Sequence, residues 1–441
     1  MTRHAGARIF QSDRRFFERV LPGCPTTRIE RLLLMGTIIL IPAESYFPTV
    51  AGMSIMRLAL MVMAVYIIAN RPDSVARTAS HPVFLAAYTF ICLAFIIEGS
   101  HPYTNFEMIF RIGQMFVGAI LVASLCRDRK ALRAGMYGYM VAGIYVSVLL
   151  LGTTYGTLSA SSASNFNEAS QIRDIALADQ PLGANVNALG FYTAQGVVVA
   201  LAFAFTAKSA RRRNVFLGIG MLCMMSTFLP MSRSAVVIAA VASGAIVVVR
   251  GVNVKTISLS ILLGLGVTLL VPGVAFYRLA VPTEASSGGK LESRARIYTA
   301  TIHHFPEYAI TGVGAGNFHS SWGWQSEFVE SDSMRVSVTG AHNVFAQVTI
   351  YWGLAALVVF MVVVFQAYRC IPGRNRDDGL ALCLVGMAVS LLLLSLFVHN
   401  IYSKEFSLGL GLLVGARVWI WPQGSVRPAA RSLSRFSVRH A

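Results

Sequence analysis

The sequence predicts an all-α polytopic membrane protein with about 12 transmembrane helices. Apolar residues make up 55% of the 441 residues and charged residues only 13%, whereas a typical soluble domain carries about 25% charged residues. Apolar runs recur along the chain, each long enough to cross roughly 30 Å of hydrocarbon as a helix. Because lipid offers no partner for backbone N–H and C=O groups, such runs are expected to be helical.

The apolar runs and the polar stretches between them divide the chain into five parts. We expect a basic N-terminal tail over residues 1–30, and nine spans over 31–273. A large polar loop with the active-site residues follows over 274–342, then three spans over 343–421 and a basic C-terminal tail over 422–441. We expect both tails to lie on the cytoplasmic side of the membrane.

The individual spans follow from runs of apolar residues. They are expected near residues 31–47, 54–70, 82–98, 105–125, 132–152, 184–207, 214–230, 235–250, 256–273, 343–368, 379–398 and 404–421. Pro42, Glu44 and Pro48 interrupt the first span, so it should be kinked or shorter than the others.

The distribution of positive charge predicts the orientation of these spans. With both termini in the cytoplasm, 27 of the 37 Lys and Arg residues fall in cytoplasmic segments, as the positive-inside rule requires. The net charge of +17 is therefore explained by orientation and by contact with anionic lipid head groups, and we expect no nucleic-acid partner. The first 30 residues lack the short apolar core of a cleaved signal peptide.

The cysteines predict neither disulfides nor a metal site. All six fall in cytoplasmic segments or in spans, and no CxxC pattern is present. The histidines also lack metal-ligand spacing. We expect no metal and no cofactor.

Two segments on the predicted outer side are long. Residues 153–183 are rich in Ser, Ala and Asn, and we expect a partly ordered loop. The second segment, 274–341, gathers cationic and imidazole side chains against the general rule of the chain, which indicates a site for an anionic substrate. These side chains are Arg278, Arg294, Arg296, Arg335, His303, His304 and His319.

A short helix and a glycine-rich turn are expected within the second segment. Residues 292–305 have helical spacing, and Pro306 ends the helix. The sequence TGVGAGNF at 311–318 then predicts a tight turn. It lacks the ending of a phosphate-binding P-loop and no strand precedes it, so it is not predicted to hold a nucleotide.

Arginines at the outer surface are the candidate phosphate ligands. Arg233 lies between two spans in PMSRSA, and its planar fork suits phosphate oxygens; snorkelling to lipid head groups is the structural alternative. Arg294 and Arg296 would project from opposite sides of a helix, so they would not serve one oxygen. Arg111 follows Glu107 by one helical turn, and a structural ion pair is its alternative role.

His342 is the best candidate for a general base, because imidazole accepts a proton near neutral pH. It precedes Asn343 at the start of a span, and its structural alternative is an interfacial hydrogen bond. Asn187, near the start of another span, could bind a sugar or cap the helix.

Four segments together resemble the O-antigen ligase and O-antigen polymerase family of bacterial envelope enzymes. They are SRSA at 232–235, SRARIY at 293–298, PEYAITGVGAGNF at 306–318 and AHNVFAQVTIYWGL at 341–354. Their order and spacing match the family pattern, as does a large outer loop before the third-last span. Tyr298 departs from the pattern, because tryptophan is common there.

The resemblance implies a GT-C-like glycosyltransferase of the bacterial inner membrane with its active site on the periplasmic face. The donor would be a glycan on undecaprenyl pyrophosphate, and transfer would be metal-independent and inverting. The catalytic residues would be Arg233 and Arg294, on the pyrophosphate, and His342, on the acceptor proton. We expect the substrate-binding residues to be Arg296, Asn343, Asn187, Arg111, Gly314, Gly316 and Asn317.

Several acceptors and one other class of protein stay open at the level of sequence. A ligase would use lipid A–core as acceptor, and a polymerase would use a growing O-antigen or exopolysaccharide chain; transfer to protein hydroxyls is a related case. A transporter or flippase without bond chemistry, or a scaffold, would also fit twelve spans. Transporters usually place charged residues near the midplane, whereas here the cations gather outside, which favours the enzyme.

Overall fold

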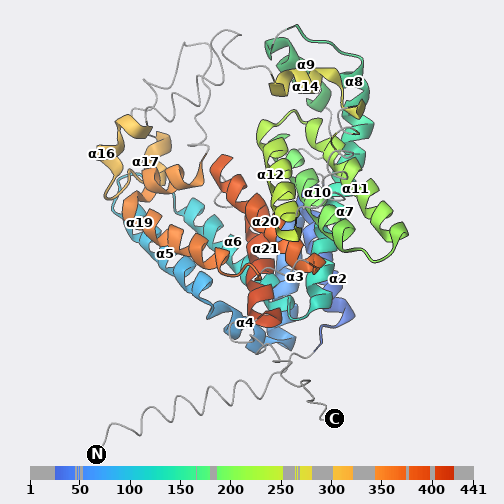
Figure 1. The fold of residues 1–441 in the computed structure, drawn as a ribbon. Coiled ribbons are helices and arrows are strands. Elements are labelled where there is room, and N and C mark those ends of the chain that lie inside the picture. The colour runs from blue at the N-terminus through green and yellow to red at the C-terminus, as the bar shows by residue number, and fades with distance from the viewer. Residues whose placement is uncertain are drawn as a thin grey trace, which may run out of the picture.

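The computed structural model describes residues 25–44, 47, 49, 53–164, 166–178, 186–251, 264, 266, 269–280, 301–320, 343–373, 377–397 and 403–421. Regular structure in these ranges is helical, as predicted for an all-α protein (Figure 1). The upper end of the bundle is the end where α12 and α19 begin, toward the top of Figure 1, and the lower end is the end where α2 begins.

The described helices are α2 (Arg28–Ala43), α3 (Ile55–Asn70), α4 (Pro72–Ala79), α5 (Pro82–Gly99), α6 (Phe106–Leu125), α7 (Arg129–Leu150), the π-helix η1 (Leu151–Tyr155), α8 (Gly156–Ser159), α9 (Phe166–Ala178), α10 (Val186–Thr206), α11 (Ala210–Phe228), α12 (Arg233–Arg250), α14 (Gly273–Ala280), α16 (Phe305–Tyr308), α17 (Ala315–Ser320), α19 (Val344–Tyr368), α20 (Gly379–Phe397), α21 (Lys404–Gly415) and the π-helix η3 (Ala416–Ile420).

Seven helices in the described ranges are long and apolar enough to cross a membrane, as expected of a multi-pass membrane protein. They are α5, α6, α7 with its extension to Ser159, α10, α12, α19 and α20, and each overlaps a predicted span. The chain bends by 107° between helices α3 and α4. If this bent pair is one span, it is an eighth candidate span.

The structure gives less support for the other predicted spans. Helices α2, α3 and α21 coincide with predicted spans but have only 16, 16 and 12 residues, and α11 begins with the three arginines Arg211–Arg213. The predicted span at 256–273 lies mostly outside the described residues. The total of about 12 spans therefore stays a prediction. The first described helix, α2, ends at Ala43, just after Pro42, and is shorter than the seven long helices but not shorter than α3 or α21.

The prediction of a loop over residues 153–183 is wrong for most of that segment. The helix that begins at Arg129 continues through η1 and α8 to Ser159, and α9 occupies Phe166–Ala178. A π-helical turn lets a helix absorb an extra residue without ending, and packing of α9 against α14 stabilises a 13-residue helix that would be marginal on its own. The polar composition indicated exposure to water, and it did not exclude a helix.

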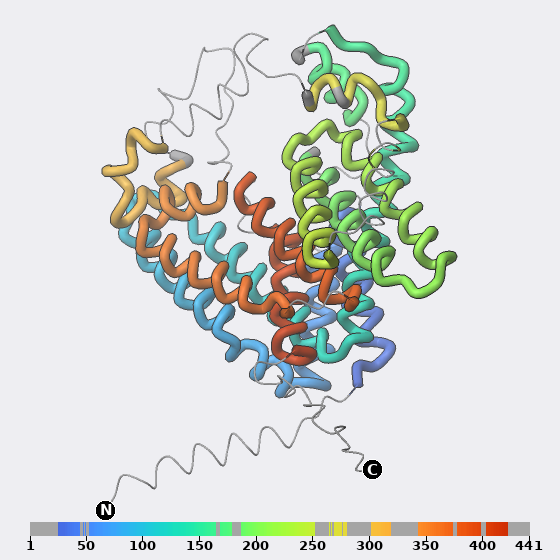
Figure 2. Tube along the Cα trace, in the orientation of Figure 1, coloured from blue at the N-terminus to red at the C-terminus, as the bar shows by residue number. Residues whose placement is uncertain are grey.

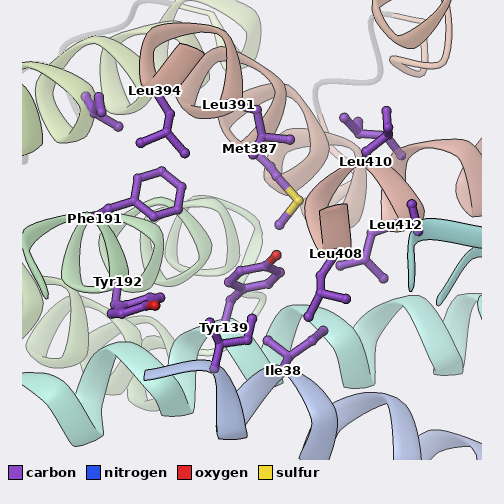
Figure 3. Close-up of a cluster of buried hydrophobic side chains, with 14 of the residues drawn as sticks. Ile38, Tyr139, Phe191, Tyr192, Met387, Leu391, Leu394, Leu408, Leu410 and Leu412 are labelled. Carbon is purple, nitrogen blue, oxygen red and sulfur yellow. The ribbon is translucent and has the colours of Figure 1, made fainter. Parts of the chain in front are cut away.

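Helix α10 lies at the centre of the bundle. The helix is almost entirely buried, with 89% of its apolar span inside the protein, and it packs against α7, α11, α12 and α20. Small residues permit these close approaches: a Cβ on Gly143 of α7 would lie only 2.8 Å from the Cα atom of Gly196. Figure 3 shows Phe191 and Tyr192 of α10 in one apolar cluster with Tyr139, Leu394 and Met387.

Ion pairs tie helices together at the lower end. The buried carboxylate of Glu30 in α2 accepts hydrogen bonds from Arg127 at 2.6 Å and Arg71 at 3.1 Å, and Arg129 of α7 pairs with Asp378 at 2.7 Å. A buried carboxylate is stable only when cations and donors surround it. These contacts join segments that are far apart in the sequence and hold the lower end in one arrangement.

The upper end depends on a second buried carboxylate, that of Glu98 at the end of α5. Its side chain is 0% exposed. One oxygen accepts hydrogen bonds from the backbone N–H of Asn105 at 2.7 Å and of Gly316 at 2.9 Å. The other accepts from the N–H of Ala315 at 2.8 Å and the indole of Trp352 at 3.0 Å. Glu98 therefore joins α5, α17 and α19, and it satisfies two N–H groups that begin α17 and have no partner within that helix.

Glu98→Gln is expected to destabilise the protein by at least about 2 kcal/mol, because the amide replaces one charged acceptor with a donor that faces N–H groups. Thermal unfolding of the detergent-solubilised protein measures the change. Glu107→Gln is the matched control, since the Glu107 side chain is 72% exposed and pairs with the likewise exposed Arg111 one turn later. Equal shifts in the two variants would contradict the role given to Glu98.

Candidate functional site

The glycine-rich turn docks into a break in helix α19. Gly353 has φ of 75°, which interrupts the helix and exposes carbonyl groups that would otherwise bond within it. The N–H of Val313 donates to the carbonyl of Ile350 at 2.8 Å, and that of Gly314 donates to the carbonyl of Tyr351 at 2.9 Å. The predicted tight turn is present at 311–314, whereas residues 315–318 of the predicted segment begin helix α17. The partner of the turn is the bent α19, visible in Figure 2.

Glycine is required here by close approach as well as by backbone conformation. Gly312 and Gly314 have φ of 68° and 79°, in the left-handed region that side chains disfavour. A Cβ on Gly314 would lie 2.7 Å from the His101 ring, and one on Gly316 would collide with the carbonyl of Tyr103. In the structure Gly314 and Gly316 pack against the connection between α5 and α6, and Gly312 packs against the backbone of Tyr351 in α19. The substrate-binding role expected for Gly314, Gly316 and their neighbour Asn317 stays a prediction.

The helix α19 that receives the turn begins at Asn343. The side-chain oxygen of Asn343 accepts hydrogen bonds from the N–H groups of Phe345 at 2.9 Å and Ala346 at 3.1 Å, so Asn343 is the N-cap of this helix. The preceding residue, His342, lies outside the described residues, as do Arg294 and Arg296. The cap fixes the point at which the chain carrying His342 enters α19.

Arg233 is the first residue of α12, at the upper end of the bundle. The hydroxyl of the preceding Ser232 donates to the side-chain oxygen of Asn187, near the start of α10, at 2.7 Å, and lies 3.1 Å from the hydroxyl of Ser234. Two candidates from distant parts of the sequence, Arg233 and Asn187, are thus brought together by a Ser–Asn contact. A helix N-terminus with nearby hydroxyl and guanidinium donors favours an anion.

Arg278 of α14 completes this cluster. Its carbonyl accepts a hydrogen bond from Nη2 of Arg233 at 3.1 Å, and its own guanidinium donates to the carbonyl of Met231 and, at 3.1 Å, to the hydroxyl of Ser170 in α9. Burial, together with the positive charges of Arg173 and Arg233, lowers the pKa of Arg278 to about 10. Arg278 therefore remains protonated at neutral pH and adds to the positive potential of the cluster.

Arg111 has the structural contact that its spacing suggested. Its Nη2 lies 2.5 Å from the Glu107 carboxylate one helical turn earlier, and both side chains are largely exposed. An exposed pair of this kind contributes little to stability. A role of Arg111 in substrate binding stays a prediction.

Sequence reasoning missed Glu98, Ser170 and the contacts of Arg278. A glutamate in the last turn of an otherwise apolar span is costly unless it has partners, and this signal could have pointed to Glu98. The contact of Ser170 could not be predicted, because its segment is predicted to be a loop. In the part of the chain that the structure describes, no three His, Cys, Asp or Glu side chains lie close enough to hold a metal ion.

The fold and the polar cluster define a polytopic membrane protein with a cationic, hydrogen-bonded cluster at one end. Residues 218–361 match the family model described as O-Antigen ligase, which confirms the resemblance to the O-antigen ligase and polymerase family. The matched region contains Arg233, Arg278, the glycine-rich turn and Asn343. The match supports O-antigen ligase or polymerase activity in general. No protein of curated function matches the chain.

Gly353→Ala is expected to lower the thermal unfolding temperature clearly, because the new Cβ would collide with the Ile310 carbonyl and alanine at φ of 75° is strained by roughly 1–2 kcal/mol. Gly244→Ala in α12 is the matched control: nothing lies within 4 Å of its Cβ position, and alanine favours a helix by about 1 kcal/mol. A Gly353→Ala protein as stable as Gly244→Ala would contradict the docking role of the turn.

Proposed function

We propose that this protein is a membrane glycosyltransferase that moves a glycan from a lipid pyrophosphate to an acceptor hydroxyl. The observation that carries the proposal is the cluster of Arg233, Ser232, Asn187 and Arg278 at the start of α12, inside the region that matches the O-antigen ligase family. Guanidinium groups and a helix N-terminus are donors suited to phosphate oxygens.

The reaction proposed is a single displacement at the anomeric carbon. The bond between that carbon and the phosphate oxygen breaks, and a bond to the acceptor oxygen forms on the opposite face, so the configuration inverts. The acceptor proton passes to His342, acting as general base. The pyrophosphate leaves as an anion, and Arg233 and Arg294 stabilise its developing charge in place of a divalent metal.

We further propose that the donor lipid is undecaprenyl pyrophosphate and that transfer occurs at the periplasmic face of a bacterial inner membrane, with both termini in the cytoplasm. The distribution of Lys and Arg along the sequence supports this orientation. It would place the upper end, with Arg233 and Asn343, in the periplasm. Arg296, Arg111, Asn187, Asn343 and the residues of the glycine-rich turn would then contribute to binding of the glycan or its lipid carrier.

We propose lipid A–core as the acceptor, which makes the protein an O-antigen ligase. The alternative within the same family is a polymerase, which extends a growing O-antigen or exopolysaccharide chain with the same chemistry. The alternative of another class is a transporter or flippase. A transporter must open a path at both ends of the bundle, and the buried Glu30–Arg127 pair and the partly exposed Arg129–Asp378 pair at the lower end favour the enzyme.

Replacement of Arg233 or His342 is expected to abolish most transfer by the purified protein. Arg233→Ala should lower kcat/KM at least about 100-fold through loss of charge stabilisation, and Arg233→Lys should recover little because the planar fork is lost. His342→Ala should lower kcat about 100-fold while donor binding survives. Transfer of a glycan from its lipid pyrophosphate is the measurement.

Arg213→Ala is the control for this series. Arg213 is an exposed arginine near the start of α11, whereas Arg233 follows the opposite end of that helix. It should transfer glycan at the wild-type rate. Normal transfer by both the Arg233 and the His342 variants would show that the site is assigned to the wrong residues.

A deletion strain of the source bacterium is expected to lose long-chain glycan and accumulate lipid-linked glycan, and only the wild-type gene should restore transfer. Gel profiles of membrane glycans measure this, with His342→Ala as the inactive control. Accumulation of full-length chains would indicate a ligase, and accumulation of single repeats a polymerase. An unchanged profile would favour the transporter or scaffold.

A further inference from the structure

The turn immediately before Arg233 is strained. Met231 has φ of 50°, and it is the one non-glycine residue with positive φ in the described part of the chain. A side chain at such a φ crowds the neighbouring backbone, so the conformation persists only where surrounding contacts hold it. Met231 is completely buried, and its N–H donates to the carbonyl of Phe228 at 2.8 Å.

Arg278 is the side chain that holds this turn from outside. Its Nη1 donates a hydrogen bond to the carbonyl of Met231, and its Nε donates to the hydroxyl of Ser170 at 3.1 Å. The Arg278 side chain is buried, and the residue is only 8% exposed. One guanidinium group therefore links the strained turn to α9, while its own backbone belongs to α14.

The same residue also holds the Arg233 side chain. Nη2 of Arg233 donates to the backbone carbonyl of Arg278 at 3.1 Å. Arg278 thus supports Arg233 in two ways: its guanidinium group holds the carbonyl of Met231, two residues before Arg233, and its backbone carbonyl accepts a hydrogen bond from the Arg233 guanidinium group. Because a guanidinium group is planar and its donors point in fixed directions, this bond restricts the plane of the Arg233 fork.

We propose that Arg278 is a positioning residue for Arg233: it holds the turn at Met231 and the guanidinium group of Arg233 so that Arg233 meets the anionic donor in one orientation. This inference rests on the proposed function and gives one residue of its cluster a positioning role. Preorganised donors stabilise developing charge without the cost of reorientation. A small displacement of Arg233 would then be enough to slow the reaction.

Positive charge by itself is the competing explanation, because Arg278 also raises the local potential. Arg173 of α9 separates the two explanations. It acts on Arg278 through its charge, but its described hydrogen bonds go to the adjacent Asp174, at 2.9 and 2.5 Å, and not to the turn. Arg173→Gln removes one positive charge and leaves the contacts of Met231 and Arg233 in place.

The first test measures kcat and the donor KM for transfer from a lipid-linked glycan. Arg278→Gln should lower kcat about 10- to 100-fold, as expected for a misplaced catalytic group, with the donor KM changed less than about threefold because transition-state interactions are lost first. Arg173→Gln should lower kcat less than about threefold. Arg278→Lys, which keeps a charged donor, should recover part of the loss.

A double-mutant cycle shows whether Arg278 acts through Arg233. In an Arg233→Lys protein, which keeps residual activity, Arg278→Gln should lower kcat by less than about threefold further, since coupled residues give non-additive effects. The same fold loss in both backgrounds, or equal losses for Arg278→Gln and Arg173→Gln, would overturn the inference while the proposed function stands.

A second measurement does not depend on catalysis. Amide hydrogen exchange over residues 229–235 should be at least about tenfold faster in Arg278→Gln than in Arg173→Gln, because opening of the turn becomes easier. Absence of transfer by the wild-type protein would refute the proposed function, and exchange would still decide the positioning role: unchanged exchange would overturn it. If Arg278→Gln does not fold, Arg278→Lys is compared with Arg173→Lys in the same way.

Discussion

The upper end of this protein is organised by one buried carboxylate, Glu98. A charge enclosed among apolar helices is tolerated only when donors surround it, and Glu98 has four: two backbone N–H groups at the start of α17, the N–H of Asn105 and the indole of Trp352. These donors come from three distant parts of the chain. The requirement to satisfy one carboxylate therefore determines how α5, α17 and the bent α19 meet.

In another part of the upper end, the arginine cluster, hydrogen bonds to a buried charged group again join separate segments. Arg278 connects α14, the turn at Met231 and Ser170 in α9, and it is linked to Arg233, the residue proposed to bind the donor. Local backbone rules are broken at Met231 and at Gly353. Both breaks lie in segments that carry or support candidate site residues, where a strained backbone is most often retained for function.

Prediction from sequence succeeded for features that depend on the residues of a single segment. The apolar runs that became α5, α6, α10, α19 and α20 were found because the bilayer requires a fixed length of apolar helix, and the glycines predicted the tight turn that the structure has at 311–314. The loop predicted over 153–183 was wrong, because helix formation there depends on packing of α9 against α14. Arg233 and Asn187 were chosen separately, and their contact through Ser232 could not be inferred from spacing.

The sequence by itself determined that this is a helical membrane protein, where most of its spans lie, and which arginines, histidine and glycines deserve testing, because hydropathy, charge bias and motif order are properties of the chain. Only the tertiary structure decided that Glu98 joins α5 to the glycine-rich turn, that Gly312 and Gly353 permit that turn to enter α19, and that Arg278 holds Arg233. Hydrogen bonds between residues 45 or 217 positions apart depend on how helices pack, and packing is set by the whole set of contacts at once.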